Sequence, residues 1–351
     1  LVCMRIEEVK FTEAIFHATR DAMEKRPEVY VIGLGVSYPN GADGTMGNLG
    51  ERFPSRVLDT PVSEAAVTGA ALGSAVSGMR PVVHHGRVEF ALFAADQIIT
   101  QASKWNYMFG GDYPAPIVFR IAVGRQWGNG PQHTQALYSL FGAVPGLKVV
   151  VPSSPYMAKG LLAAAIDDPN PVVFLEPRWL YQLRQPIPTD QYLVPLSEGR
   201  VVKSGKDVTL VAYGDGVVAA TQASKLLSQH KVDAEIIDLV SINPFDFGPI
   251  FKSVAKTGRL VTIDTTSHAF SVGKMVIAEV LEREFHLVRH PPLSIAGPNV
   301  PVPTATSLTE AFYPNYLSIA NEVLAHMGKP AVEMKLSFEE LHLPPSHTVV
   351  S

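Results

Sequence analysis

The chain has 351 residues, 46% of them hydrophobic and 18% charged, with a formal net charge of −4. This length exceeds what one hydrophobic core usually serves, so we expect two domains. The slightly acidic charge and the lack of a basic cluster in the sequence exclude nucleic acid as an expected partner. With Cys3 as the single cysteine, the sequence offers neither an intrachain disulfide nor a thiolate metal site.

The N-terminal residues predict no targeting or membrane segment. Charged side chains at Arg5, Glu7, Glu8 and Lys10 interrupt any apolar run, which excludes a signal peptide. The sequence also lacks an apolar stretch of about twenty residues, the length that crosses a bilayer as a helix. We therefore expect a cytoplasmic protein without a membrane partner.

Helical and strand patterns alternate along the first half of the chain. Residues 6–25 predict an amphipathic helix, because Val9, Ile15, Phe16 and Met23 recur at helical spacing. Further helices are expected at 65–78, 89–106 and 156–166, and short buried strands at 29–32, 117–121, 148–151 and 172–175. Strands that alternate with helices indicate an α/β fold with a mainly parallel sheet.

A proline-punctuated region separates this half from a second α/β pattern. We expect a surface linker at 186–206, strands at 208–213, 234–238 and 260–264, and helices at 217–229, 273–285 and 317–327. Residues 291–303 are proline-rich and predict a loop. The expected division is a first domain at 1–185, a second at 207–330 and a loosely held tail at 331–351.

Glu64 is the one acidic residue between Asp59 and Glu89, and it begins a run of small residues. A carboxylate placed where a neighbour packs so closely must be neutralised, hydrogen-bonded or used in chemistry. It is equally consistent with a carboxylate at a helix N-terminus, where the helix dipole favours negative charge. The loop at 39–50, rich in glycine and asparagine, does not predict a dinucleotide fingerprint, because Phe53-Pro54 follows it instead of a helix.

Several separate segments resemble one enzyme family. They include Asp59-Thr60-Pro61-Val62-Ser63-Glu64 and residues 78–83, 96–99, 132–135, 145–150, 158–162 and 170–172, followed by 237–239, 256–261 and 297–303. The order and spacing resemble the beta subunit of the decarboxylating dehydrogenase component of 2-oxo acid dehydrogenase complexes, over about residues 13–324. These are thiamine-diphosphate enzymes of the transketolase superfamily. The resemblance implies a pyrimidine-binding domain followed by a transketolase C-terminal-like domain.

The resemblance also implies site residues. Glu64 takes the position of the carboxylate that hydrogen-bonds the aminopyrimidine ring of the cofactor and so helps to generate its internal base. Phe90 matches the aromatic residue that stacks on this ring, and Val62 is a further cofactor contact. His133 matches a histidine at the substrate end, where it would stabilise charge or pass a proton. Taken without the resemblance, Phe90 reads as an ordinary core residue and His133 as an exposed turn residue.

Metal ions are assigned by the same resemblance. A potassium site would be built largely from main-chain oxygens at Ile117, Ala165, Ile166, Asp168 and Asn170, and oxygen ligands suit such a hard cation. The alternative is a helix C-terminus with a turn and no ion. Gly214-Asp215-Gly216 imitates the start of a diphosphate–magnesium motif but lies in the second domain, at an expected strand-to-helix turn. The diphosphate and Mg²⁺ are therefore expected on an alpha-type partner subunit in an α2β2 heterotetramer.

Two segments depart from the family pattern. They are His84-His85-Gly86-Arg87-Val88-Glu89 and the loop that contains Arg125-Gln126-Trp127, and both are expected near the substrate channel. These residues suit an anionic substrate larger than pyruvate or an acceptor other than lipoamide; alternatively, Arg87 pairs with Glu89 or with a partner subunit. Our leading interpretation is the beta subunit of a 2-oxo acid dehydrogenase that passes an acyl group to a lipoyl acyltransferase core. The alternatives are a thiamine-dependent carboligase or acyl transferase of specialised metabolism, and a non-catalytic homologue.

Overall fold

The computed structural model describes residues 5–38, 41–125 and 128–346, which form two compact units. The first unit comprises Leu1–Val123 and Leu140–Leu196, and the second comprises Gly124–Ser139 and Ser197–Ser351. Each unit is an α/β structure with a largely parallel sheet, which confirms the predicted fold class. Among the described residues, no helix is long and apolar enough to cross a membrane.

The first unit is built on a parallel sheet. Its strands are β2 (Val29–Gly33), β3 (Val57–Asp59), β4 (Arg80–His85), β5 (Val118–Val123), β6 (Lys148–Val150) and β7 (Val172–Pro177). They lie in the order β6-β7-β5-β4-β2-β3, and each of these neighbouring pairs is parallel. Strands β2, β5 and β7 are buried along their whole length. That burial follows from their Val- and Ile-rich sequences and from helices on both faces of the sheet.

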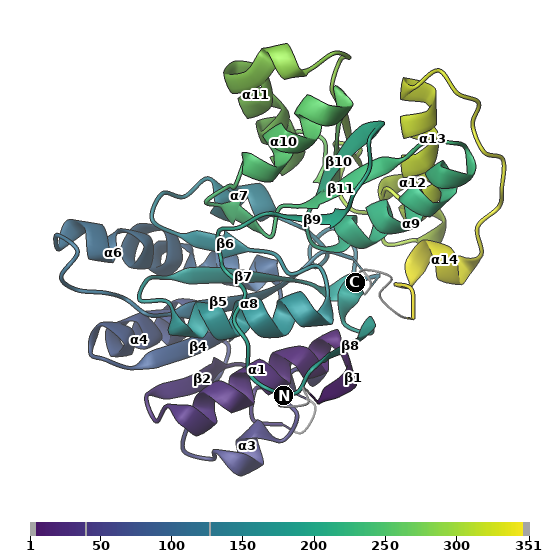
Figure 1. Ribbon diagram of the computed structural model, residues 1–351. Helices are drawn as coiled ribbons and strands as arrows, with labels where there is room; N and C mark the ends of the chain where they lie inside the picture. The colour runs from purple at the N-terminus through teal and green to yellow at the C-terminus, as the bar shows by residue number, and fades with distance from the viewer. Residues whose placement is uncertain (1–4, 39–40, 126–127, 347–351) are drawn as a thin grey trace. The chain divides into compact units, whose positions relative to one another are not determined.

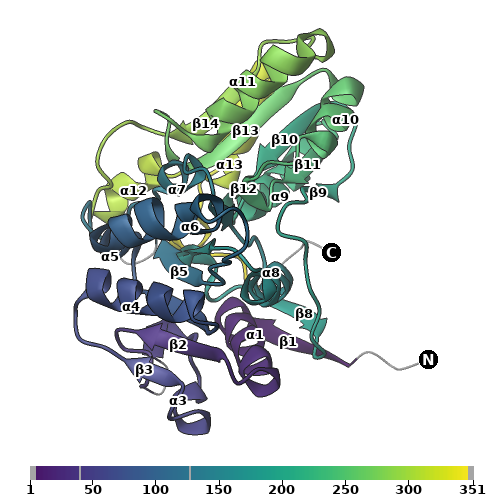
Figure 2. The ribbon, with the colours of Figure 1, turned by 90° about the vertical axis from the view of Figure 1, so that its left-hand side faces the viewer.

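Helices cover the two faces of this sheet (Figure 2). On one face α1 (Phe11–Lys25) packs against α8 (Pro155–Asp167), and on the other lie α4 (Glu64–Val76) and α6 (Ser103–Met108). Helix α8 begins where the sequence predicts, because the Ser154 side chain accepts a hydrogen bond from the Met157 N–H and Pro155 occupies the first turn.

Two helix predictions in the first unit need correction. Residues 6–25 form a strand, β1 (Ile6–Lys10), before α1, because β1 pairs antiparallel with β8 (Arg184–Pro188), a partner far along the chain. Residues 89–106 are broken into α5 (Val88–Ala91), the 3₁₀ turn η1 (Leu92–Ala94), the π-helix η2 (Asp96–Ala102) and α6. A π-helix inserts extra residues per turn, so the apolar spacing that predicted one straight helix is not kept.

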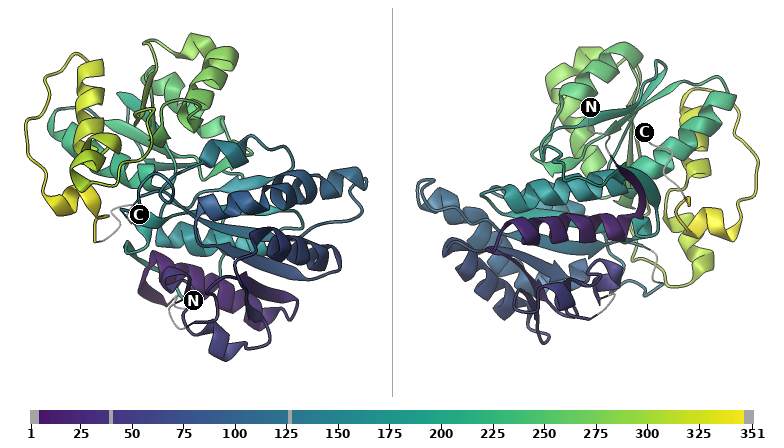
Figure 3. Two further views of the ribbon diagram at one scale, coloured as in Figure 1. Left: turned by 180° about the vertical axis from the view of Figure 1, so that it is seen from behind. Right: turned by 60° about the horizontal axis from the view of Figure 1, so that its bottom comes forward.

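The second unit is built on a smaller sheet. Its strands are β9 (Arg200–Lys203), β10 (Val208–Ala212), β11 (Ala234–Asp238), β13 (Leu260–Ser267) and β14 (Leu293–Gly297). They lie in the order β14-β13-β10-β11-β9. Within this order the edge strand β9 is antiparallel to its neighbour, and the other neighbouring pairs are parallel. Helices α9 (Asp215–Gln229) and α13 (Tyr316–His326) lie on one face, and α10 (Gly248–Thr257) and α11 (Val272–Glu284) on the other (Figures 1 and 3). The core joins the sheet to α9 and α13.

Several segments differ from the sequence prediction in the second half. The expected loop at 291–303 contains β14, since Leu293 and Ile295 pair with β13. The expected linker at 186–206 contains the end of β8 and all of β9. The expected tail carries a capped helix, α14 (Phe338–His342), and the Asn321 side chain exchanges two hydrogen bonds with the backbone of Val332. Backbone pairing with distant strands orders β8, β9 and β14 despite the nearby prolines, whereas helix capping and the Asn321 side chain hold the tail.

The remaining elements are short. They are α2 (Gly41–Gly44), α3 (Leu49–Arg52), α7 (Tyr138–Gly142), η3 (Arg178–Leu180), β12 (Ser241–Asn243), η4 (Phe285–Leu287) and α12 (Thr306–Phe312). Residues 124–139 fall in the second unit although the sequence assigns them to the first domain. Contacts within the second unit explain this: Ser139 Oγ donates to the Phe270 carbonyl oxygen at 2.6 Å, and the Tyr138 ring meets the Tyr213 ring edge-on.

Candidate active site

Glu64 and Phe90 line the same small pocket in the first unit. Glu64 is the first residue of α4 and Phe90 lies in α5, while Gly33 and His84 bring in the carboxyl ends of β2 and β4. Its volume is about 70 Å³. Ligands of open α/β sheets bind outside the carboxyl ends of the strands, so the pocket has the expected place for a ligand site.

Close backbone approach shapes the rim of this pocket. Gly33 has φ +157°, and a Cβ there would lie 2.5 Å from the carbonyl oxygen of His84, so only glycine fits without a shift. On the other side Asp59 holds the turn that follows β2, accepting from the Gly35 N–H and from the Ser37 hydroxyl, both at 2.7 Å. These contacts fix the backbone that leads to Glu64.

Glu64 is half-buried at the start of α4. The helix buries Thr68, Ala71, Leu72 and Ala75, and the π-helix packs closely against it. A Cβ at Gly69 would lie 3.6 Å from Cγ of Gln97, which is ordinary contact distance. The small residues thus allow the close packing that the sequence predicts, and the carboxylate has both a helix N-terminus and a pocket beside it.

Two adjacent histidines form a buried wall of the pocket. His84 is 5% exposed and His85 is 3% exposed, and Nε2 of His85 lies 3.3 Å from the Thr68 hydroxyl. Burial lowers the pKa of His85 to about 4. Burial, Arg120 and His85 hold the pKa of His84 well below its usual value. Both imidazoles are therefore neutral at neutral pH. Nδ1 of His84 is buried without a hydrogen-bond partner among the described residues.

A buried ion pair that the sequence analysis missed lies next to these histidines. Arg120, opposite His84 across the β4–β5 ladder, donates from Nε to Oε1 of Glu176 at 2.6 Å and from Nη2 to Oε2 at 3.1 Å. Both side chains are 0% exposed. Glu176 also accepts from the Tyr181 hydroxyl at 2.9 Å. The position of Arg120 inside an apolar strand is the one sign of this ion pair in the sequence. Its partner Glu176 cannot be found from the sequence pattern, because it lies 56 residues away.

The other predicted contacts lie elsewhere. Val62 is 71% exposed and is not among the described residues that line the pocket. His133 is half-buried in the segment that groups with the second unit, where its N–H donates to the Gly130 carbonyl oxygen at 3.3 Å. Its role stays a prediction. Gln126 and Trp127, predicted near the channel, lie outside the described residues, whereas Arg125 is buried within the second unit.

Positions expected to hold potassium gather near the end of α8. Nη1 of Arg80 donates to the carbonyl oxygens of Ile166 at 2.7 Å and Asp168 at 3.1 Å. The Asp168 carboxylate pairs with Lys148 and accepts from the Asn170 N–H. The carbonyl oxygens of Ile117 and Ala165 accept backbone N–H groups from Val172 and Asp168. An ion here would share oxygens, each with two lone pairs, with a guanidinium. Potassium stays a prediction.

Gly214 and Asp215 form a strand-to-helix turn between β10 and α9, as the sequence analysis expects. Asp215 is buried, accepts from the Thr265 hydroxyl at 2.9 Å and lies beside Arg125. These contacts within the protein explain its presence without a diphosphate.

Comparison with known proteins decides the family. Residues 7–184 match "Transketolase, pyrimidine binding domain", and residues 197–319 match "Transketolase, C-terminal domain". The chain is 37% identical over 337 residues to the acetoin:2,6-dichlorophenolindophenol oxidoreductase subunit beta of Bacillus subtilis, covering 92% of this chain and 98% of that protein. It is 40% identical over 315 residues to the pyruvate dehydrogenase E1 component subunit beta of Rhizobium meliloti, covering 89% and 68%. The chain belongs to the transketolase-type dehydrogenase beta-subunit family.

A solved structure shares the fold of this beta subunit. The chain described as "Split gene transketolase, inactive beta4 tetramer" superimposes with a TM-score of 0.75 at 21% identity, covering 91% of this chain and 98% of that one. At this identity the likeness concerns the fold.

Family membership implies association with thiamine diphosphate, and the first-unit pocket can be tested against its aminopyrimidine ring. The pocket offers a half-buried carboxylate for a ring nitrogen and a half-buried phenyl ring for stacking. Beside it, the buried Nδ1 of His84 is a polar atom without a hydrogen-bond partner among the described residues. These residues fit the pyrimidine half of the cofactor.

Proposed function

We propose that this chain is the beta subunit of a thiamine-diphosphate-dependent 2-oxo acid dehydrogenase that works with an alpha-type partner. The observation that carries the proposal is that Glu64 and Phe90 line one pocket at the carboxyl ends of β2 and β4. The family relation adds support, since the chain spans 98% of a relative named as the beta subunit of an acetoin oxidoreductase and 68% of one named as the beta subunit of pyruvate dehydrogenase E1.

In this proposal Glu64 handles a proton at the aminopyrimidine. Its carboxyl group shares a proton with a ring nitrogen, which favours the form of the neighbouring amino group that acts as a base. The helix N-terminus of α4 stabilises the carboxylate when the proton leaves it. When bound, thiamine diphosphate supplies the nucleophilic carbon and the electron sink that decarboxylation of a 2-oxo acid requires.

Other residues position the ring and keep the site dry. Phe90 stacks on the pyrimidine, and the neutral wall of His84 and His85 closes one side of the pocket without adding a charge that would compete with Glu64. We assign His133 to the substrate side, where an imidazole stabilises a developing negative charge or donates a proton.

The remaining parts of the proposal concern partners. We assign the diphosphate and Mg²⁺ to the alpha-type subunit in an α2β2 assembly, and the acyl group to a lipoyl domain of an acyltransferase core. Potassium at the end of α8 belongs to the same proposal.

The testing experiment is co-expression with the alpha-type chain, followed by assay of pyruvate and branched-chain 2-oxo acids with a lipoyl domain as acceptor. Turnover that requires both chains and the cofactor is expected; no turnover of any 2-oxo acid would contradict the proposal.

A second candidate is oxidative cleavage of an acyloin. It is favoured by two relatives named acetoin:2,6-dichlorophenolindophenol oxidoreductase subunit beta, from Bacillus subtilis and Cupriavidus necator. The same purified complex, assayed by reduction of 2,6-dichlorophenolindophenol, separates the candidates. Faster turnover of acetoin than of any 2-oxo acid would favour the acyloin reaction. Lipoyl-independent carbon–carbon bond formation would point to a carboligase, and loss of cofactor binding in the complex to a non-catalytic homologue.

A further inference from the structure

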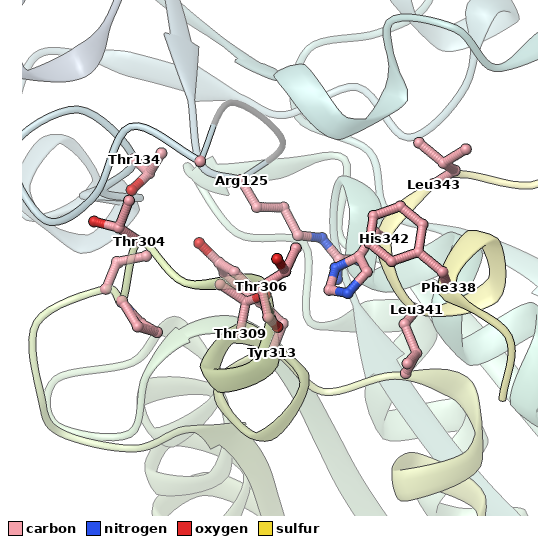
Figure 4. Close-up of a pocket in the computed structure, with 13 residues that line it drawn as sticks. Arg125, Thr134, Thr304, Thr306, Thr309, Tyr313, Phe338, Leu341, His342 and Leu343 are labelled. Atoms are coloured by element: carbon pink, nitrogen blue, oxygen red, sulfur yellow. Dashed lines mark hydrogen bonds between the residues drawn. The ribbon is translucent and has the colours of Figure 1, made fainter. Parts of the chain in front are cut away.

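A second pocket lies wholly within the second unit (Figure 4). Its volume is about 280 Å³, near the lower end of the roughly 300–1,000 Å³ that small-molecule sites occupy. All of its lining residues come from the loop after β5 and from the region between Val302 and Leu343. It shares no lining residue with the pyrimidine pocket, whose lining residues all belong to the first unit.

One end of this pocket is cationic. Arg125 lines it and is 8% exposed, and its guanidinium carbon lies 5.1 Å from the centre of the Tyr313 ring. Asp215 is a carboxylate neighbour of this arginine, and its Oδ2 lies 3.6 Å from Nε of Arg125. Asp215 does not line the pocket, so it lies behind the guanidinium and holds it in place from the protein side. A ligand in the pocket therefore meets the arginine before it meets the aspartate.

Hydroxyl groups surround the cationic end. Thr306 and Thr309 line the pocket beside Tyr313, and the close-up shows the three side chains gathered next to Arg125 (Figure 4). The Thr309 hydroxyl donates to the Thr306 carbonyl oxygen at 2.8 Å, which orients it. This bond uses the Thr309 proton, so the donors suited to a carboxylate or phosphate oxygen are the Thr306 hydroxyl and the Arg125 guanidinium.

The opposite end is apolar and comes from the C-terminal segment. Phe338, Leu341 and Leu343 line it, and they belong to or follow α14, which lies beyond the matched C-terminal domain at 197–319. In Figure 4 these side chains stand across from the threonines, with His342 between them and Arg125. Burial and the Arg125 charge lower the pKa of His342, so this imidazole adds no positive charge at neutral pH.

We propose that this pocket binds a small monocarboxylate with an apolar body, with the carboxylate on Arg125 and the Thr306 hydroxyl and the body against Phe338 and the two leucines. An anion without an apolar part would leave the α14 wall unused. A neutral apolar molecule would leave the buried guanidinium facing a non-polar group, which is unfavourable. The proposal rests on the lining residues of the second unit alone and makes no use of thiamine diphosphate.

Titration calorimetry of the full chain tests this without cofactor or alpha partner. The probes are hexanoate, its neutral analogue hexanamide, acetate and inorganic phosphate. Hexanoate is expected to bind saturably, and about tenfold or more tightly than the other three, because each of them lacks either the charge or the apolar body. Equal binding of hexanoate and hexanamide, tighter binding of phosphate, or no saturable binding of hexanoate would overturn the proposal.

Variants locate the site. Phe338→Ala changes a side chain that is 61% exposed, so it leaves the fold intact, and it should weaken hexanoate binding by about fivefold. Phe285→Ala, 69% exposed in the same unit and absent from the pocket lining, is the matched control and should bind like the parent chain. Arg125→Gln should remove the preference for hexanoate over hexanamide. If Phe338→Ala binds hexanoate as tightly as Phe285→Ala, the pocket is not the site.

Discussion

Replacing Arg120 by methionine should destabilise the first unit by about 3–5 kcal/mol, because the change leaves the Glu176 carboxylate buried without its cation. The magnitude follows from the geometry. Both side chains are 0% exposed, and two charge-assisted bonds of 2.6 and 3.1 Å join them. After the change Glu176 keeps the bond from the Tyr181 hydroxyl, which satisfies one oxygen but not the charge.

The assay is urea unfolding combined with amide hydrogen exchange in β5 and β7, which assigns the loss to the first unit. Arg178→Met is the matched control, since Arg178 pairs with Asp43 at 2.8 Å but the two side chains are 18% and 35% exposed, and it should cost no more than about 1 kcal/mol. The double variant R120M/E176M should recover much of the loss. A loss below about 1 kcal/mol for Arg120→Met, or a double variant as unstable as the single one, would refute the reasoning.

Three further predictions concern the same unit. The pKa of His85 is about 4 when folded against a usual 6.5, so between these values the unfolded chain binds a proton that the folded chain does not, and stability falls as the pH is lowered. From pH 7 to pH 5, His85→Gln should lose about 2 kcal/mol less than the parent in urea unfolding; equal losses would contradict the buried neutral imidazole. Gly146→Ala should cost at least about 2 kcal/mol, because φ is +94° and the new Cβ would lie 1.9 Å from the Ser103 carbonyl oxygen. Gly73→Ala, where a Cβ meets nothing within 4 Å in α4, should stabilise by about 0.5–1 kcal/mol, and the order of the two thermal midpoints checks both.

Local signals in the sequence were sufficient for much of the fold. Ser154 and Pro155 predict the start of α8, and the apolar runs of β2, β5 and β7 predict buried parallel strands. Elements held by distant partners were missed. Strand β1 depends on β8, and β14 depends on β13, so neither could be recognised from its own residues.

In the candidate site, too, some residues could be predicted from the sequence and others depend on distant contacts. Glu64 stands out in the sequence because of its small neighbours, and the family resemblance adds Phe90; both line the pocket. The burial of His84 and His85 depends on the neighbouring strands and on α4, which a linear pattern of two histidines does not reveal. The partner of Arg120 and the assignment of residues 124–139 to the second unit depend on contacts between residues far apart in sequence.

Glu64→Gln in the complex with the alpha-type subunit tests the central claim most directly. Glutamine keeps the size and a hydrogen bond but cannot exchange the proton. Thiamine-diphosphate-dependent turnover should therefore fall by about 10² or more, while the folded structure stays intact by circular dichroism. Glu51→Gln, which changes an exposed carboxylate on α3, is the control and should leave turnover unchanged. Full activity of Glu64→Gln, with the cofactor bound as in the parent complex, would contradict the account.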